Sequence, residues 1–519
     1  MMKKTGSWRR PCITSGTGHP DMPTALLRFD ASPTIGGGHA MRCLTLANAL
    51  HAGGWSCVLW TNEEAPQLLP QLVQGPHAWS SCLPGRGTPY AWAIVDHYQL
   101  DAHFERSLRR HADRILVLDD LANRPHDCDL LLDQTLGRPS SDYQPWVPPS
   151  CTLLTGSDHA LLRPQFSNWR WQALQRQRPQ PHQAWRILVS LGAGDSGDLL
   201  PRVVEGLALA AQALSLPLEV TVIAATTVRL EQNHPFLTIR HQSAVTDMAP
   251  LMAESDLAIG AAGSTAWERC CLSLPTLALE LADNQHAVIT ALAQQGALLS
   301  LGRSDRMQPE QLSLAVMTLI RDRDQWTAMS QQAARLCDGM GTARLLDHLD
   351  PIYSHEGRPV RLSRASLSDT DTILSWQQHP DTRRWARNPQ PPTATEHRHW
   401  MERHVDDPNC LLHLIVHGEH EQPVGVLRLD FIDPAFEVSI LIDPHHYRLG
   451  LGHAALRLAR RLLPQATLQA EILTDNKASQ ALFSQAGYQR ISETIWQSDW
   501  QSDWQSGGTT SSVTPAPTP

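Results

Sequence analysis

Short apolar runs alternate with amphipathic stretches over the first part of the chain. The runs at 91–95 (AWAIV) and 114–118 (RILVL) are almost continuously apolar, which is typical of strands covered on both faces, as in a parallel sheet. Companion strands are expected at 25–29, 57–60 and 130–132. After the first strand, Leu44, Ala47 and Leu50 recur at helical spacing. This alternation of strand and helix predicts an α/β fold.

The same alternation returns after a stretch rich in proline and glutamine, Gln175 to Gln183, which predicts a hinge. Beyond it, a strand runs twice into a glycine-rich turn and a helix. The segments are 186–197 (RILVSLGAGDSG), 218–224 (LEVTVIA), 256–271 (DLAIGAAGSTAWERCC) and 275–281 (PTLALEL). Two open α/β sheets with such turns imply a ligand-binding cleft between them.

From Pro359 on, a charged sequence with tryptophan replaces this alternation, which indicates a different kind of domain. The residues from Trp496 repeat WQSD and end in Ser, Thr and Pro, which predicts a disordered tail. A docking motif at Trp500 and Trp504 is the alternative. The predicted parts are a flexible N-terminal extension (1–22), two Rossmann-like domains (23–183 and 184–350), a linker (351–358), a third domain (359–495) and the tail (496–519).

Composition narrows the class of protein. A length of 519 residues suggests three domains, and a net charge of -9 gives no basic surface for nucleic acid. The ten cysteines are scattered without a C-x-x-C pair, which favours a reduced protein without a structural zinc site. No apolar run reaches the roughly 18 residues of a membrane span, and the basic N-terminus lacks the apolar core of a secretory signal. We therefore expect a cytoplasmic enzyme with no nucleic-acid or membrane partner.

The most informative segment is 28–47 (RFDASPTIGGGHAMRCLTLA), where the first strand meets the first helix. The strand runs into Asp30, a polar turn and three glycines, and His39 follows at the start of the helix. Glycines let a ligand approach the backbone, and the N–H groups of a helix start favour anions. Because the helix dipole disfavours a protonated imidazole there, His39 is a candidate general base beside a phosphate-bearing ligand. A capping or packing histidine is the alternative.

This segment resembles the opening of the PseG family, the UDP-sugar hydrolases of pseudaminic acid biosynthesis. That family resembles the two-domain GT-B glycosyltransferases such as MurG. The resemblance covers nearly all of 23–345, including D-H-Y at a predicted strand end and ALLRPQF at 160–166. It implies a GT-B-like pair of Rossmann-type parallel-sheet domains with His39 as catalytic base. The other substrate residues expected in the first block are Asp30, Gly37, Gly38, Asp96, His97, Tyr98 and Arg163. Turn capping by Asp96 and His97, and a structural contact for Arg163, stay open.

The resemblance places UDP on the second block. The stretch 260–267 (GAAGSTAW) offers N–H groups and hydroxyls at a helix start, which suit a pyrophosphate. Glu268 lies one turn after Ser264, and in MurG-like enzymes a glutamate of this helix binds both ribose hydroxyls. The residues expected to bind the nucleotide are Gly263, Ser264, Thr265, Glu268, Asn284 and Gln285. For the glycine turn at 192–195, close approach of a ligand to the backbone is a simpler explanation than a direct catalytic role. Loop capping explains Asp119-Asp120, since GT-B enzymes need no metal-binding D-x-D and the hydrolysis is expected to require no metal.

In the third domain, a strand at 438–443 (VSILID) leads into PHHYRLGLGHA at 444–454, which resembles the acyl-CoA pyrophosphate loop of GNAT acetyltransferases. Small residues and free N–H groups there suit two phosphates. The acetyl-CoA-binding residues that this resemblance implies are Arg448, Leu449, Gly450, Leu451, Gly452, His453, Asn476 and Ser479. Two positions depart from the family. Tyr447 stands at the first position of the loop, and Phe483 replaces the tyrosine that protonates the CoA thiolate in many members.

Together the resemblances imply two consecutive reactions. A PseG-like hydrolase removes UDP from UDP-2,4-diacetamido-2,4,6-trideoxy-β-L-altropyranose, with water as the acceptor. A PseH-like acetyltransferase acetylates the 4-amino group of the precursor, with acetyl-CoA as co-substrate. The expected partners are therefore a UDP-linked diamino-trideoxy sugar and acetyl-CoA. Two alternatives stay open: a GT-B glycosyltransferase with an accessory GNAT domain, and a hydrolase whose GNAT domain only senses acetyl-CoA, which Phe483 favours.

Overall fold

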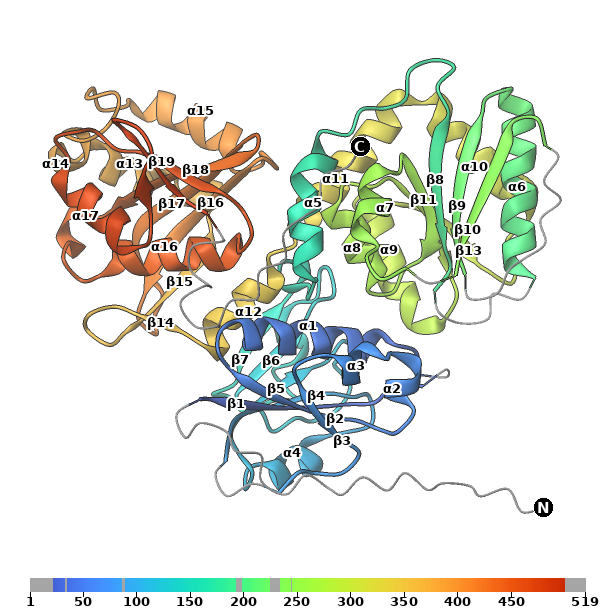
Figure 1. The fold of residues 1–519 in the computed structure, drawn as a ribbon, viewed down its shortest axis with the longest axis horizontal. Helices are drawn as coiled ribbons and strands as arrows, with labels where there is room; N and C mark the ends of the chain where they lie inside the picture. The colour runs from blue at the N-terminus through green and yellow to red at the C-terminus, as the bar shows by residue number, and fades with distance from the viewer. Residues whose placement is uncertain are drawn as a thin grey trace, which may run out of the picture. The chain divides into compact units, whose positions relative to one another are not determined.

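The computed structural model describes residues 22–32, 35–85, 89–192, 198–224, 234–243 and 245–499. The chain divides between Leu346 and Asp347 into two compact units. The first unit carries two parallel sheets and the second unit carries a mixed sheet, which Figure 1 colours by place in the chain. The predicted fold class, two Rossmann-type parallel-sheet domains followed by a further α/β domain, is confirmed.

The first sheet has the strand order β3-β2-β1-β4-β5-β6-β7, and all its pairs are parallel. Its strands are β1 (Thr24–Phe29), β2 (Ser56–Trp60), β3 (Ala78–Ser80), β4 (Tyr90–Asp96), β5 (Ala112–Leu118), β6 (Leu130–Asp133) and β7 (Thr152–Thr155). The strand order reverses between β1 and β4, where Phe29 pairs with Asp96. Ligands bind at such a switch point because the loops that follow the two strands diverge there.

Helix α1 (Gly38–Ala52) follows β1 and begins at the glycines, as predicted. Leu44, Ala47 and Leu50 are buried on this helix, which packs against β1 and β2. The other helices of the block are α2 (Ala65–Leu68), α3 (Gln71–Gln74) and α4 (Ala102–Leu108), with 3-10 turns η1 (Ser140–Asp142) and η2 (Ser157–His159). The local sequence therefore places His39 at the carboxyl end of the sheet.

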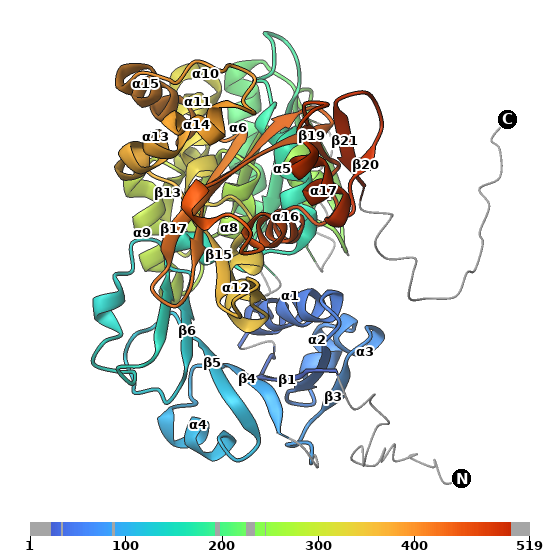
Figure 2. The same ribbon diagram turned by 90° about the vertical axis from the view of Figure 1, so that its left-hand side faces the viewer.

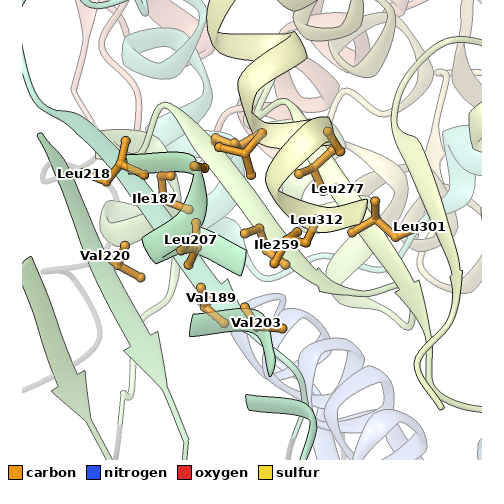
Figure 3. Packing of buried hydrophobic residues seen from close by; sticks show 14 of the residues in the cluster. Ile187, Val189, Val203, Leu207, Leu218, Val220, Ile259, Leu277, Leu301 and Leu312 are labelled. Atoms are coloured by element: carbon orange, nitrogen blue, oxygen red, sulfur yellow. The ribbon is translucent and has the colours of Figure 1, made fainter. Parts of the chain in front are cut away.

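The second sheet repeats this plan in the order β10-β9-β8-β11-β12-β13, again with parallel pairs. Its strands are β8 (Trp185–Ser190), β9 (Leu218–Ile223), β10 (Leu237–Gln242), β11 (Leu257–Ala261), β12 (Thr276–Glu280) and β13 (Leu299–Arg303). Helices α6 (Leu199–Leu214) and α10 (Pro309–Arg321) pack on each other, and Figure 3 shows Leu207 and Leu312 of these helices in one core with Ile187 and Ile259 of the strands. The remaining elements are α7 (Ala249–Glu254), α8 (Thr265–Cys271), η3 (Asp283–Gln285), α9 (His286–Gln294), α11 (Arg323–Leu336) and α12 (Gly341–Leu349).

Helix α5 (Pro164–Leu174) precedes the predicted hinge but packs with α7 and α8 of the second block. Phe166 shares a hydrophobic core with Trp267. The buried Arg170 guanidinium donates a hydrogen bond to the carbonyl oxygen of Cys271 at 2.6 Å. The proline- and glutamine-rich stretch thus follows helix α5, which joins the blocks. The hydrophobic core of the second block already includes residues of α5, which precede that stretch.

The second unit holds an eight-stranded sheet in the order β14-β15-β16-β17-β18-β19-β21-β20. Its strands are β14 (Ile352–Tyr353), β15 (Pro359–Arg364), β16 (Cys410–His417), β17 (Gln422–Ile432), β18 (Ala435–Ile442), β19 (Leu468–Glu471), β20 (Gln489–Arg490) and β21 (Ile495–Ser498). The helical elements are η4 (Leu367–Asp369), α13 (Thr370–Gln378), α14 (Pro380–Arg383), α15 (Ala394–His404), η5 (Pro444–His446), α16 (Leu451–Leu462) and α17 (Lys477–Gln485). Strands β18 and β19 are parallel but pair only at Phe436–Leu468 and Glu437–Gln469. Helix α16 packs against β14 and β15, and Figure 2 shows it beside β15.

Two predicted boundaries of the second unit need correction. The linker predicted at 351–358 contains β14, which pairs with β15, and the tail predicted from Trp496 begins within β21, which pairs with β19. Composition missed both strands because pairing with a neighbouring strand orders these short segments. The predicted N-terminal extension through residue 21, the turn residues 193–197 and the tail from 500 on, with Trp500 and Trp504, lie outside the described residues.

Candidate active sites

His39 lies on the first turn of α1 and lines a cavity in the first unit. His39 is 6% exposed. No side chain caps α1, so the alternative that His39 is a capping residue does not hold. Its Nδ1 lies 2.5 Å from Oδ1 of Asp96, which ends the neighbouring strand β4. Because the carboxylate engages Nδ1, Nε2 is the nitrogen that remains for a ligand.

Asp96 is fully buried, so it acts through its neighbours rather than as the sugar contact that the sequence predicts. Arg42, one turn after His39, donates from Nε to Oδ2 at 3.0 Å and from Nη2 to Oδ1 at 2.7 Å. Burial by itself raises the pKa of Asp96, but Arg42 and His39 hold it well below its ordinary range. The carboxylate is therefore ionised, and its short contact with Nδ1 requires a proton on Nδ1. This tautomer leaves a lone pair on Nε2, as a general base needs.

Arg42 Nη2 and His39 Nδ1 lie 3.1 Å apart, but they do not bond to each other. Both atoms are donors, and both point at Oδ1 of Asp96. The guanidinium thus shares the carboxylate with the imidazole and neutralises part of its charge.

Tyr98 forms a further side of the cavity. Its ring meets His39 edge-on with 4.6 Å between the centroids, and its hydroxyl donates to Oδ2 of Asp120 at 3.4 Å. Burial and Asp120 raise the pKa of Tyr98 to about 12, so the hydroxyl keeps its proton near neutral pH. Asp120 also accepts a bond from Arg42 and lines the cavity, so the loop-capping interpretation is wrong for it.

Sequence reasoning missed Arg42 and Asp120 as site residues. A signal was present for Arg42, which follows His39 by three residues and therefore shares its helix face. For Asp120 the signal was its place just after β5, beside the central strand β4. The adjacent Asp119 does cap the loop, since it accepts bonds from the N–H groups of Leu121 and Ala122 at 3.1 and 2.9 Å.

Asp30 and His97 form a separate pair in the first block. The Asp30 carboxylate accepts bonds from Arg28 and from the N–H of Asn62, and its Oδ2 lies 3.2 Å from Nε2 of His97. Neither residue belongs to the cavity lining around His39. The geometry thus gives Asp30 a role in fixing the loops after β1 and β2, and sugar contact by this pair stays a prediction.

The opposite wall of the cavity comes from the second block. Its lining residues there are Ala262, Gly263, Ser264, Trp267, Asn284, Gln285 and Val288. They follow β11 and β12, the strands at and beside the switch point of the second sheet. The side chain of Asn284 interacts with the hydroxyl of Tyr98. Four of the six predicted nucleotide residues therefore face the same cavity as His39.

The other two predicted nucleotide residues, Thr265 and Glu268, do not line this cavity. Gly37, a predicted substrate residue of the first block, does not line it either. Glu268 instead pairs with Arg163, with 3.3 Å between Oε1 and Nη2. Burial raises the pKa of Glu268, and Arg163 offsets only part of that effect. Arg163 also donates to the carbonyl oxygen of Thr246. The two predicted contacts thus hold each other, and their roles toward ribose and sugar stay predictions.

In the second unit, the predicted acetyl-CoA loop joins β18 to α16. Its backbone is left-handed at Arg448 and Gly450, with φ of 67° and 77°. Gly450 precedes the first turn of the twelve-residue helix α16, where Leu451, Gly452 and His453 present backbone N–H groups. Beyond Glu437, the described part of β18 does not pair with β19, so this strand edge is open beside the loop.

The α17 residues of this site have structural contacts. The Oδ1 of Asn476 accepts the N–H of Ser479 at 3.0 Å and caps the helix. Phe483 is 3% exposed, and its ring meets Tyr488 edge-on with 4.9 Å between the centroids. The position of the usual tyrosine acid therefore belongs to the core, and acetyl-CoA binding by Asn476 and Ser479 stays a prediction.

Within the described residues, no group of three or more His, Cys, Asp or Glu side chains is arranged to hold a metal ion. Over the same part of the chain, no helix is long and apolar enough to cross a membrane.

Comparison with known proteins first identifies the domain of the second unit. Residues 360–489 match the family described as "Acetyltransferase (GNAT) domain", so the second unit contains a GNAT domain. MurG of Acinetobacter baumannii aligns with 63% of this chain and 99% of its own, with 17% identity and a TM-score of 0.46. An acetyltransferase from Thermus thermophilus covers 27% of this chain and 96% of its own, with 19% identity and a TM-score of 0.25.

Two relatives match parts of the chain in sequence. The "Spore coat polysaccharide biosynthesis protein SpsG" of Bacillus subtilis (strain 168) is 26% identical over 220 residues, or 41% of this chain and 62% of SpsG, so the chain spans less than two thirds of that relative. The "UDP-2,4-diacetamido-2,4,6-trideoxy-beta-L-altropyranose hydrolase" of Campylobacter jejuni subsp. jejuni serotype O:2 is 24% identical over 279 residues, or 52% of this chain and 96% of the hydrolase. The predicted resemblances to the PseG family and to GNAT enzymes are confirmed.

Proposed function

We propose that the first unit hydrolyses a UDP-sugar and that the GNAT domain acetylates the amino-sugar precursor of that substrate. The observation that carries the hydrolase is the buried His39–Asp96 pair, which opens onto a cavity shared by both parallel-sheet blocks. A positioned base on one wall and a glycine- and hydroxyl-bearing loop on the other are the two groups that cleavage of a nucleotide-sugar requires.

In this reaction His39 Nε2 takes a proton from a water molecule. The water oxygen bonds to the anomeric carbon while the bond from that carbon to the phosphate oxygen breaks, and UDP leaves with the electron pair. The imidazolium that forms is stabilised by Asp96, which holds Nδ1 throughout. Arg42 keeps the carboxylate ionised, so the proton stays on the ring.

Departure of UDP adds negative charge next to the second block. The backbone at Gly263 and Ser264 and the amides of Asn284 and Gln285 line that side of the cavity. Donors fixed before the reaction stabilise such charge without further reorganisation. Tyr98 faces the same space, and because its single proton is donated to Asp120, its hydroxyl oxygen is an acceptor toward the sugar.

The proposed substrate is UDP-2,4-diacetamido-2,4,6-trideoxy-β-L-altropyranose, the sugar in the printed name of the Campylobacter relative. Its hydrolysis would belong to pseudaminic acid biosynthesis in the cytoplasm. A fused GNAT domain agrees with this choice, because a diacetamido sugar is made by acetylating an amine. The acceptor proposed for acetyl-CoA is therefore the 4-amino group of the UDP-linked precursor.

The test supplies the full-length protein with the UDP-linked 4-amino sugar and acetyl-CoA and follows the sugar signals by NMR. We expect an N-acetylated UDP-sugar first and then free sugar and UDP, with His39→Ala stopping at the acetylated UDP-sugar. Rapid UDP release by His39→Ala would refute the assigned base. If UDP appeared only after a second sugar or a lipid was added, the first unit would be a glycosyltransferase.

The core position of Phe483 favours one second candidate for the GNAT domain, an acetyl-CoA sensor without turnover. In the same NMR experiment, a sensor binds acetyl-CoA but leaves both the thioester and the 4-amino group unchanged.

A further inference from the structure

The segment 347–358 connects the two units and lies outside the matched GNAT domain, which begins at residue 360. In the structure it nevertheless belongs to the second unit. Its strand β14 pairs with β15 at Ile352–Val360 and Tyr353–Pro359 and makes a hairpin at the edge of the sheet. The turn of this hairpin carries His355.

His355 contacts the predicted acetyl-CoA loop at three places. Its backbone N–H donates to the carbonyl oxygen of Leu449 at 2.9 Å, and its Nδ1 lies 3.3 Å from the carbonyl oxygen of Arg448. Its ring lies directly against Gly450, where an added Cβ would be 2.6 Å from the ring Cδ2. The hairpin thus engages three consecutive residues of the loop.

These contacts fall where the loop backbone needs support. Arg448 has a φ of 67°, which costs free energy for a residue with a Cβ, and Gly450 has a φ of 77°. A conformation of this kind persists when its surroundings hold it. The first N–H groups of α16 have no acceptor within the helix, so a ligand can accept from them when the loop holds this conformation.

The hairpin is itself anchored to the rest of the unit. Ser354 Oγ lies 2.9 Å from Nε2 of His417 on β16. Arg461 of α16 donates to Asp347 Oδ1 and Asp350 Oδ2, both at 2.9 Å. The helix that follows the loop is therefore tied to the residues that lead into the hairpin.

We propose that His355 is a positioning residue of the acetyl-CoA site, supplied by the segment that connects the two units. Its imidazole holds the Arg448–Gly450 turn in the left-handed conformation that presents the N–H groups of α16 to the CoA diphosphate. This inference rests on the proposed binding of acetyl-CoA at that loop.

The test measures acetyl-CoA affinity by calorimetry and acetyl transfer by steady-state kinetics, both on the full chain. His355→Ala is expected to weaken acetyl-CoA binding and raise its KM by about 3- to 10-fold, the size of one lost hydrogen bond with some packing. The kcat and the KM for the amine acceptor should stay near wild type. His355→Asn, which keeps a donor near Arg448, is expected to restore part of the affinity. His420→Ala, at an exposed histidine in the turn between β16 and β17, is the matched control and should change nothing.

A second measurement tests the packing against Gly450. Gly450→Ala should weaken acetyl-CoA binding more in the wild-type background than in His355→Ala, because removal of the ring makes room for the added methyl group. Equal penalties in the two backgrounds, or a wild-type KM in His355→Ala, would overturn the inference. UDP release by the first unit reports that each variant is intact there. If the wild-type chain bound no acetyl-CoA, the proposed function of the GNAT domain would fail instead.

Discussion

Exchange of Asp96 for Asn changes the chemistry of His39 with little change in shape. Arg42 donates to both carboxylate oxygens, and His39 shares Oδ1, so either orientation of the new amide sets its NH₂ against a donor. With the NH₂ at the Oδ1 position, His39 Nδ1 must accept, and the ring proton moves to the nitrogen that faces the cavity. With the NH₂ at the Oδ2 position, the tautomer stays, but the negative charge that stabilises the imidazolium is lost. In both cases His39 is a poorer base toward water.

The size of the effect follows from this loss of base strength. A positioned general base contributes about 10²–10⁴ to a rate, and that range is the expected fall in kcat for Asp96→Asn. In the Ser-His-Asp triad the same exchange costs about 10⁴. The structure should survive, because the new amide still accepts from Arg42 and Asp120 remains 3.4 Å from the guanidinium. The loss of stability should stay below the roughly 3–5 kcal/mol of a broken buried ion pair.

The assay measures UDP release from the diacetamido UDP-sugar together with UDP affinity and thermal unfolding. The affinity should stay near wild type, because the second block supplies the predicted nucleotide contacts. Asp119→Asn is the matched control, since Asp119 is also a buried carboxylate after a strand of the same sheet but holds a loop. It should lower the unfolding temperature with little effect on kcat. A folded Asp96→Asn protein with wild-type kcat would refute the role given to the His39–Asp96 pair.

Three further predictions concern other parts of the chain. Glu268→Ala should weaken UDP binding about 10-fold or more while kcat falls less, because a contact with the ribose stabilises the bound substrate and the transition state about equally. Unchanged UDP affinity in calorimetry would remove Glu268 from the nucleotide site. Burial by itself raises the pKa of Asp338, but Arg344 holds it well below its ordinary range, so the stability from this pair is complete above about pH 4 and lost as the pH falls further. Asp338→Asn should therefore flatten the acid side of the unfolding curve, and an unaltered slope would contradict this. A chain that begins at Gly357 lacks Asp347, Asp350 and His355 and should unfold at a lower temperature than one that begins at Gly341; equal temperatures in calorimetry would show that the segment adds no stability.

The central strands of both parallel sheets and the place of His39 could be predicted because their signals are local, whereas β3, β7, β10 and β13 were not predicted. Five apolar runs of the first block became β1, β2, β4, β5 and β6, and the glycine turn after β1 does start a helix. The pairing of His39 with Asp96 is not a local property. His39 and Asp96 are 57 residues apart in the chain and meet because β1 and β4 lie side by side, which follows only from the strand order.

The errors in the sequence analysis share one physical cause. Asp120 looked like a loop cap because its neighbour Asp119 is one, and only the tertiary structure separates a carboxylate that accepts backbone N–H groups from one that faces Arg42 and Tyr98. Strands β14 and β21 are short and are ordered by the strands they join. Where a segment is fixed by the strand or side chain that it contacts, its own composition carries little of the signal that would predict its structure.

The proton balance of acetyl transfer follows from what surrounds α17. The amine nitrogen bonds to the acetyl carbon, the carbon–sulfur bond breaks, and the CoA thiolate needs a proton. Phe483 cannot supply one. The hydroxyl of Tyr488 is buried, and burial raises its pKa above the ordinary value, so it keeps its proton inside the core. The attacking nitrogen itself is a donor, since it must lose a proton as the amide forms. Transfer of that nitrogen proton to sulfur balances the step without an acid on α17, so loss of the tyrosine at position 483 is compatible with turnover.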